Sequence, residues 1–146
     1  MVIFPYMLSA IEQARKAFIH NEVPVGAVVV KEATLLASGY NLVKTTSDLT
    51  AHAEILALRA ASQILGTSYL DDCDLYVTLE PCAMCAAAMA LARIRYLYFG
   101  AYDPKGGGVD HGAKIFKHSL HKPTVVGGIN ERECSNLLID FFKTKR

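Results

Sequence analysis

The sequence predicts an α/β protein, a three-layer α/β/α sandwich with a five-stranded mixed sheet. Short runs rich in β-branched residues alternate with longer segments of helical period, which is typical of strands joined by crossovers that cover both faces of a sheet. The first two strands are separated by a short connection, so they should form an antiparallel hairpin. At 146 residues, we expect a single domain over residues 1–146.

The N-terminal third should contain one helix and the hairpin. Residues 5–18 have helical period. The apolar residues at this spacing, which we expect in the core, are Met7, Ile11, Ala14 and Phe18. Residues 25–30 are typical of a central strand, and Gly26 within them indicates close approach by a ligand. Residues 35–40 should form the second strand, and the polar residues 41–49 a loop.

Two further helices are expected on either side of a third strand. Thr50 is a good N-cap for a helix over residues 51–65, which Gly66 should end. Residues 74–79 have the composition of a strand. They lead to Pro81, which suits the first position of an Ala-rich helix over residues 81–93. The carboxyl end of this strand therefore delivers the start of that helix to the edge of the sheet.

The last third should complete the sheet. Residues 96–100 and 124–127 are expected to be the fourth and fifth strands. Residues 103–110 have turn chemistry throughout, which predicts a mobile loop beside the sheet edge, and residues 111–120 should form a short helix.

The final helix is expected over residues 131–142. Its apolar face should consist of Cys134, Leu137, Leu138 and Phe141. Lys143, Lys145 and Arg146 follow it. These charges either complement the helix dipole or contact RNA phosphates.

Two short segments carry the side chains of a metal site. Cys82 and Cys85 have the C-x-x-C spacing that lets two thiolates bind one ion, and His52 would be the third ligand. Three protein ligands leave a position open for water, as in catalytic zinc sites, and Glu54 is then available to carry protons. H-x-E followed by P-C-x-x-C is the signature of zinc deaminases. A structural site would need a fourth ligand, and the other cysteines and histidines have no partner at ligand spacing.

Composition restricts the remaining possibilities. A net charge of +1 gives no general attraction for polyanions, so any RNA contact must come from a local patch. The four cysteines do not form a disulfide framework, and the N-terminus lacks a basic segment followed by a long apolar run. No apolar stretch approaches the roughly 20 residues of a membrane span. We expect a cytoplasmic protein without a membrane segment.

Several segments beyond the zinc signature carry a family resemblance. They are residues 22–27 (EVPVGA), 50–54 (TAHAE), 75–82 (LYVTLEPC) and 137–142 (LLIDFF). With these, the chain resembles the bacterial tRNA-specific adenosine deaminases of the cytidine deaminase superfamily, over nearly its whole length. The resemblance implies a cytidine deaminase-like fold and a cytosolic homodimer that uses Zn²⁺ to convert adenosine at the wobble position of a tRNA anticodon stem-loop to inosine. It also assigns Asn41 and Asp103 to the flipped nucleotide.

Alternatives stay open at this point. A deaminase of a free nucleobase or nucleoside, such as guanine or cytosine, would share every catalytic atom. Residues 106–108, all glycine, replace a more polar loop of the family near the substrate, which bears on substrate choice. A non-catalytic, zinc-stabilised RNA-binding protein would leave Glu54 without a task. Asn41 could also serve as a turn residue after the second strand.

Overall fold

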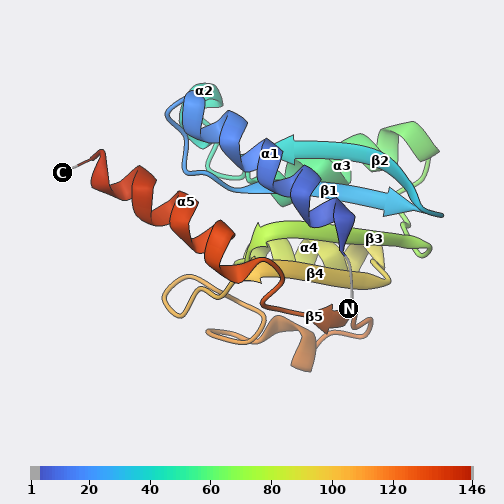
Figure 1. The fold of residues 1–146 in the computed structure, drawn as a ribbon. Coiled ribbons are helices and arrows are strands. Elements are labelled where there is room, and N and C mark those ends of the chain that lie inside the picture. The colour runs from blue at the N-terminus through green and yellow to red at the C-terminus, as the bar shows by residue number, and fades with distance from the viewer. Residues whose placement is uncertain (1–3, 146) are drawn as a thin grey trace.

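The structure, a computed structural model, describes residues 4–145 and is built around a five-stranded sheet (Figure 1). The strands are β1 (Gly26–Lys31), β2 (Thr34–Tyr40), β3 (Cys73–Leu79), β4 (Tyr96–Ala101) and β5 (Thr124–Val126). They lie in the order β2-β1-β3-β4-β5. β1 pairs antiparallel with β2 and β3, whereas β3, β4 and β5 run parallel. The expected hairpin and mixed sheet are therefore confirmed.

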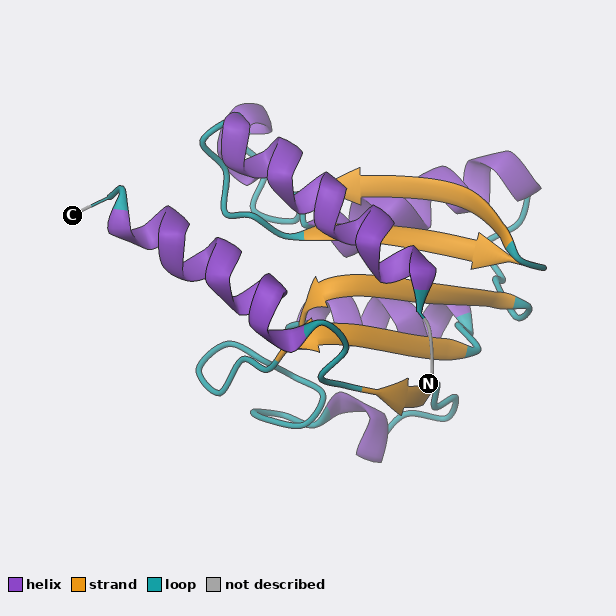
Figure 2. Cartoon of the chain, in the orientation of Figure 1, coloured by secondary structure: helices purple, strands orange, loops and turns teal. Residues whose placement is uncertain are grey.

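Helices cover both faces of the sheet and complete the three-layer sandwich (Figure 2). One face carries α1 (Pro5–Ile19) and α5 (Glu131–Lys143). The other face carries α3 (Ala53–Leu65) and α4 (Ala83–Ala92). Two short pieces lie in the connections, α2 (Val43–Thr46) and the 3₁₀ turn η1 (Ile115–Lys117). The predicted loop over 41–49 thus contains α2, and the helix predicted over 111–120 is only η1.

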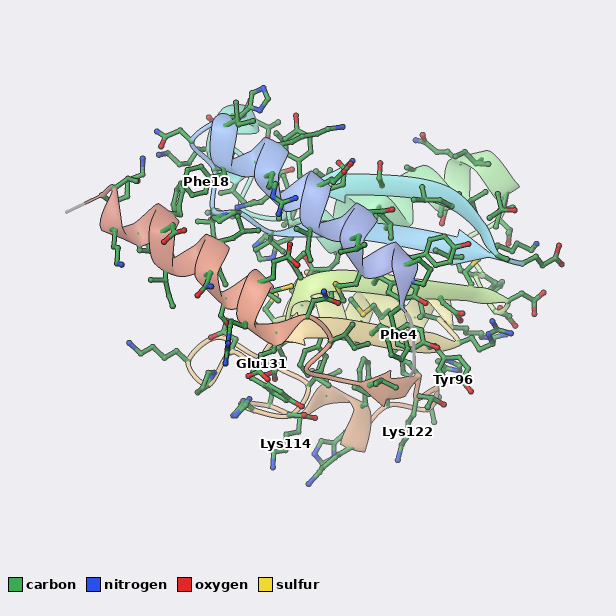
Figure 3. All side chains as sticks on the ribbon, viewed as in Figure 1. Phe4, Phe18, Tyr96, Lys114, Lys122 and Glu131 are labelled. Atoms are coloured by element: carbon green, nitrogen blue, oxygen red, sulfur yellow. The ribbon has the colours of Figure 1, made fainter. Side chains whose placement is uncertain are left out.

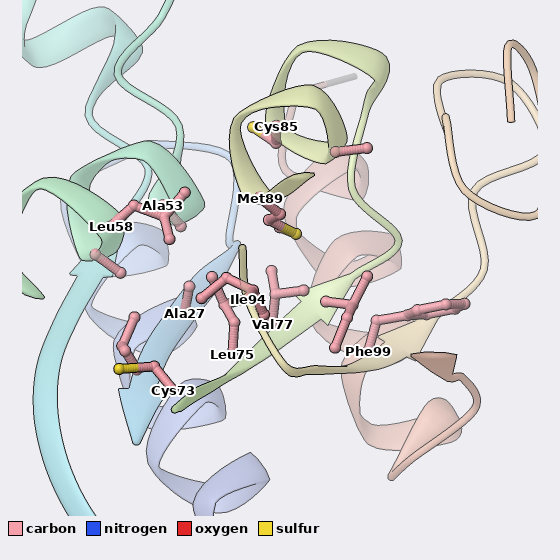
Figure 4. Close-up of a cluster of buried hydrophobic side chains, with 14 of the residues drawn as sticks. Ala27, Ala53, Leu58, Cys73, Leu75, Val77, Cys85, Met89, Ile94 and Phe99 are labelled. Atoms are coloured by element: carbon pink, nitrogen blue, oxygen red, sulfur yellow. The ribbon is translucent and has the colours of Figure 1, made fainter. Parts of the chain in front are cut away.

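Strand alternation divides the core into two layers, because successive side chains of a strand point to opposite faces. Val29 packs with the layer under α3 and α4, and Val28 with the layer under α1 and α5. Figure 4 shows the first layer, where Leu75 and Val77 of β3 lie beneath Met89 of α4. This core fixes the strand ends from which the site is built.

The N-terminal helix confirms three of its four expected core residues and corrects one expectation about β1. Met7, Ile11 and Ala14 are fully buried. Phe18, near the C-terminal end of α1 (Figure 3), is partly exposed. Its ring meets that of Phe141 edge-on, with 5.7 Å between centroids. The expected ligand approach at Gly26 is wrong. A Cβ there would collide with the α1 backbone, so this glycine allows close packing of a helix on a strand.

Both helix starts at the site lie later than expected. α3 begins at Ala53 with His52 as its N-cap, whereas Thr50 makes a local turn in which its hydroxyl donates to Asp48 over 2.7 Å. α4 begins at Ala83 with Cys82 as its N-cap, so Pro81 precedes the helix. His52 and Cys82 have extended backbones, with ψ of 152° and 173°. Each can therefore turn its side chain across the end of its helix.

Candidate active site

The starts of α3 and α4 meet beyond the carboxyl end of β3 and bring the three predicted ligands together. His52 Nδ1 lies 3.6 Å from Cys82 Sγ and 3.4 Å from Cys85 Sγ. All three ligand atoms lie within 4.8 Å of one another. Cys82 and His52 are N-caps, and Cys85 lies in the first turn of α4. This group could hold a metal ion.

The two cysteine sulfurs affect each other's pKa in opposite directions. A hydrogen bond from the Cys85 thiol lowers the pKa of Cys82 to about 4, and the same interaction raises the pKa of Cys85 above its ordinary value. The N-terminus of α4 adds the positive end of its dipole. Since a cation deprotonates the thiols that coordinate it, both sulfurs would bind an ion as thiolates.

Glu54 lies in the first turn of α3 and faces the same cavity as His52. It is only 4% exposed, and burial raises its pKa to about 7. A carboxyl group in this position can accept a proton and return it near neutral pH.

A cavity of about 400 Å³ opens over this group. Its lining is partly apolar, with Val25 and Leu79 among the wall residues, and it also includes Asn41 and Asp103. The structure thus brings both predicted substrate residues to the cavity that contains His52, Glu54 and Cys82.

The Asn41 side chain forms hydrogen bonds with the backbone and also lines the cavity. Its Oδ1 accepts the Val43 N–H at 3.2 Å, and its Nδ2 donates to the Val23 carbonyl at 3.4 Å. The side chain therefore takes part in the turn into α2, as the turn interpretation expected, while it also lines the cavity. These two bonds hold the amide in one orientation, and each polar atom keeps capacity for another partner.

Sequence reasoning missed a buried carboxylate at one wall, Glu22. It is 1% exposed and accepts hydrogen bonds from the Lys44 N–H at 3.1 Å, the Thr45 N–H at 2.6 Å and the Thr45 hydroxyl at 2.7 Å. Burial alone would raise its pKa, but these hydrogen bonds outweigh burial and lower it. Glu22 thus ties α2 to the end of α1. The signs of Glu22 in the sequence were its place beside the apolar run from Val23 and at the start of the family segment over residues 22–27.

A second buried carboxylate, Glu80, was missed at the opposite wall. Its Oε1 accepts the Asp103 N–H at 3.0 Å and lies 2.8 Å from His111 Nδ1. Its Oε2 accepts the N–H groups of Val109, Asp110 and His111 at 3.3, 2.9 and 3.1 Å. Burial acts to raise its pKa, and the accepted hydrogen bonds lower it overall. The loop expected to be mobile is therefore tied to the end of β3.

The fold and the site together define the class, a hydrolytic deaminase of the cytidine deaminase superfamily. The model of the MafB19-like deaminase family matches residues 3–146. A tRNA-specific adenosine deaminase of Agrobacterium fabrum is 47% identical over 143 residues, covering 97% of this chain and 94% of its own. The chain belongs to this deaminase family, in the branch of the tRNA-specific adenosine deaminases.

Solved structures agree with this placement. A structure from a study of A-to-I editing by tRNA:A34 deaminases at the wobble position superimposes with a TM-score of 0.90 at 45% identity, covering 92% of this chain and 100% of its own. A guanine deaminase of Nitrosomonas europaea has a TM-score of 0.82 at 25% identity, covering 97% of this chain and 86% of its own. The fold is thus shared by deaminases of different substrates.

Proposed function

We propose that this protein is a zinc-dependent deaminase that converts adenosine to inosine at the wobble position of a tRNA anticodon. The observation that carries the proposal is a group of three metal-ligand side chains, two of which, His52 and Cys82, line one cavity together with the buried Glu54, Asn41 and Asp103. The 47% identity to a tRNA-specific adenosine deaminase supports the substrate. Residues 1–146 act as one deaminase domain.

Zinc suits the donor set. Tetrahedral zinc with bonds of about 2.3 Å to sulfur and 2.05 Å to nitrogen would place each sulfur roughly 3.6 Å from the imidazole nitrogen. In the structure, these separations are 3.6 Å for Cys82 and 3.4 Å for Cys85. His52, Cys82 and Cys85 would hold the ion and leave a fourth position free, as catalytic sites require.

The reaction adds water to C6 of adenine and releases ammonia. A zinc ion held by His52, Cys82 and Cys85 would lower the pKa of water and so supply a nucleophile at neutral pH. Glu54 accepts a proton from the attacking water and delivers it to ring nitrogen N1. It then takes the second proton from the new hydroxyl group on C6 and passes it to the amine, which leaves as ammonia as the C6–N bond breaks and the C6 carbonyl forms. One carboxylate thus serves as base and acid, and the apolar lining keeps bulk water away from it.

The walls orient the base. Asn41 presents an amide that can pair with a base edge, and Asp103, from the loop of residues 103–111, lines the same cavity. A base must leave its stack to reach a cavity of this kind, and an anticodon loop, which is already single-stranded, makes this step less costly.

The surroundings support further parts of the proposal. α4 is apolar around its whole circumference, yet Leu91 is 79% exposed and Met84 37%. Such a helix is expected to be covered, and a second copy of the chain is the proposed cover. Sedimentation should therefore give two chains per particle.

All four cysteines are free, which suits the reducing cytoplasm. Within residues 4–145, no helix is both long and apolar enough to cross a membrane.

The test compares substrates. The purified protein should form inosine in an anticodon stem-loop with adenosine at the wobble position, and should leave free adenosine, cytosine and guanine nearly unchanged. The likeness to a guanine deaminase makes free guanine the second candidate. Ammonia release from guanine without inosine in the stem-loop would select that alternative.

A further inference from the structure

The loop from Asp103 to His111 is a wall of the cavity whose position depends on Glu80. Asp103 and Gly106 line the cavity, and the loop contains no helix or strand. The Glu80 side chain is 0% exposed and takes part in five hydrogen bonds with this loop. Glu80, directly after β3, therefore supplies five of the hydrogen bonds that hold this wall, and the Gly108 N–H adds another to the Pro81 carbonyl.

The chemistry of these bonds requires a carboxylate. Four of the five partners are backbone N–H groups, which only donate. An ionised carboxylate offers acceptors alone, whereas the amide of glutamine would turn an NH₂ group toward at least one donor. The glutamine side chain keeps most of these hydrogen bonds when its NH₂ group takes the position of Glu80 Oε1. The His111 ring can change tautomer there, but the Asp103 N–H loses its acceptor.

The glycines of the loop are fitted to this carboxylate. A Cβ on Gly107 would collide with Glu80 Oε2. A Cβ on Gly108 would collide with the backbone of Ala83, and the Gly108 N–H donates to the Pro81 carbonyl at 2.8 Å. Glycine therefore lets the loop close around the carboxylate and against the start of α4. Gly107 and Gly108 are therefore required for close packing, and they do not indicate a flexible hinge.

We propose that Glu80 is a positioning residue for the nucleotide, which fixes the Asp103 wall of the cavity that Glu54 also lines and so sets substrate affinity without binding metal or moving protons. The inference rests on the proposed deaminase function. According to this proposal, the segment from Glu80 to Cys85 has two separate roles. The cysteines hold the metal, and the glutamate before them shapes the cavity.

The test is Glu80→Gln in the full chain. An unsatisfied buried donor should raise KM for the wobble-adenosine stem-loop roughly 10-fold, with a smaller change in kcat and with metal content kept. Amide exchange at Asp103 should accelerate, while that at Val77 in β3 should not. Gly107→Ala should reproduce the KM effect, because it displaces the same loop and keeps the carboxylate. If both of these variants fail to fold, His111→Ala replaces them in the test, because His111 is partly exposed. KM of the His111→Ala variant should rise a few fold.

The matched control is Asp74→Asn. Asp74 lies at the opposite end of β3 and pairs with Arg95 through two contacts of 2.9 Å. It should lower the melting temperature and leave KM unchanged. A parental KM in all three loop variants would overturn the inference, and so would loss of metal in parallel with activity. If the parent is inactive on the stem-loop, the proposed function fails. Exchange at Asp103 then decides the inference, since unchanged exchange in Glu80→Gln would overturn it.

Discussion

The metal end of the cavity and its two walls are held by different means. At the metal end, His52 and Cys82 cap two helices whose bodies are packed on the sheet, so the ligand positions follow from rigid elements. At the walls, α2 and the 103–111 loop are short or irregular, and each is held by one buried carboxylate, Glu22 or Glu80. The residues that bind metal and transfer protons therefore lie on rigid helices. The fit of the substrate depends on a few hydrogen bonds at each wall, and each wall can be altered by its own substitution.

The largest effect is expected where the metal end is removed. Cys82→Ala combined with Cys85→Ala should reduce zinc from about one per chain to none and abolish deamination, because one histidine cannot hold the ion alone. Elemental analysis and the inosine assay measure both quantities. Cys73→Ala with Cys134→Ala, at two buried cysteines away from the site, is the control and should keep the metal. Zinc retained in the Cys82/Cys85 variant would exclude these ligands.

The next largest effect is expected for Glu54→Gln, which tests proton transfer at the metal end independently of metal binding. Glu54→Gln keeps the shape of the side chain but cannot shuttle protons, so we expect kcat to fall roughly 10²- to 10⁴-fold with zinc retained. Glu131→Gln, at an exposed acidic residue in the first turn of α5, should leave kcat unchanged. A Glu54→Gln variant that deaminates at the parental rate would remove Glu54 from the mechanism.

A weaker and different effect is expected at the α2 wall. Glu22→Gln places an amide against the N–H groups of Lys44 and Thr45, and one of these donors loses its acceptor. KM for the stem-loop should rise roughly 5- to 100-fold with little change in zinc content. Glu12→Gln, on the exposed face of α1, is the control. Loss of kcat without a change in KM would place Glu22 in the chemistry rather than in the wall.

This division also explains what could be predicted from the sequence. The metal ligands and Glu54 lie in two short segments with diagnostic spacing, and the hydrophobic periods predicted the sheet and the four long helices. Glu22 and Glu80 could not be found in this way, because their main partners are backbone N–H groups 22 to 31 residues away, which leave no side-chain pattern. The N-caps were misplaced for a related reason. Thr50 is the better cap by residue type, but its hydroxyl donates to Asp48, and α3 begins after His52, whose side chain lies beside Cys82 and Cys85.

The end of α5 offers two lysines in different surroundings, which gives the smallest and most selective prediction. Lys145 donates to Asn21 Oδ1 and lies 5.0 Å from the centroid of Phe141, whose ring is buried and offers no stacking surface. Lys143 is exposed, as is Phe142 at 49%. Lys145 thus has a structural task that Lys143 lacks. Arg146, the third basic residue of this end, lies outside the described residues.

Neutralising the two lysines one at a time should therefore have different consequences. Lys143→Gln should make the dependence of log affinity for the stem-loop on log salt shallower by roughly 0.7, because one phosphate contact is lost, and should leave the melting temperature unchanged. Lys145→Gln should lower the melting temperature and leave the salt dependence nearly as it was, since its ammonium group is already engaged by Asn21, just beyond the end of α1, and by an aromatic ring. Binding titrations at several salt concentrations, beside thermal melts, measure both effects. If Lys143→Gln only lowers stability, the basic end complements the helix dipole, and RNA contact must come from other residues such as Lys105 on the loop that Glu80 holds.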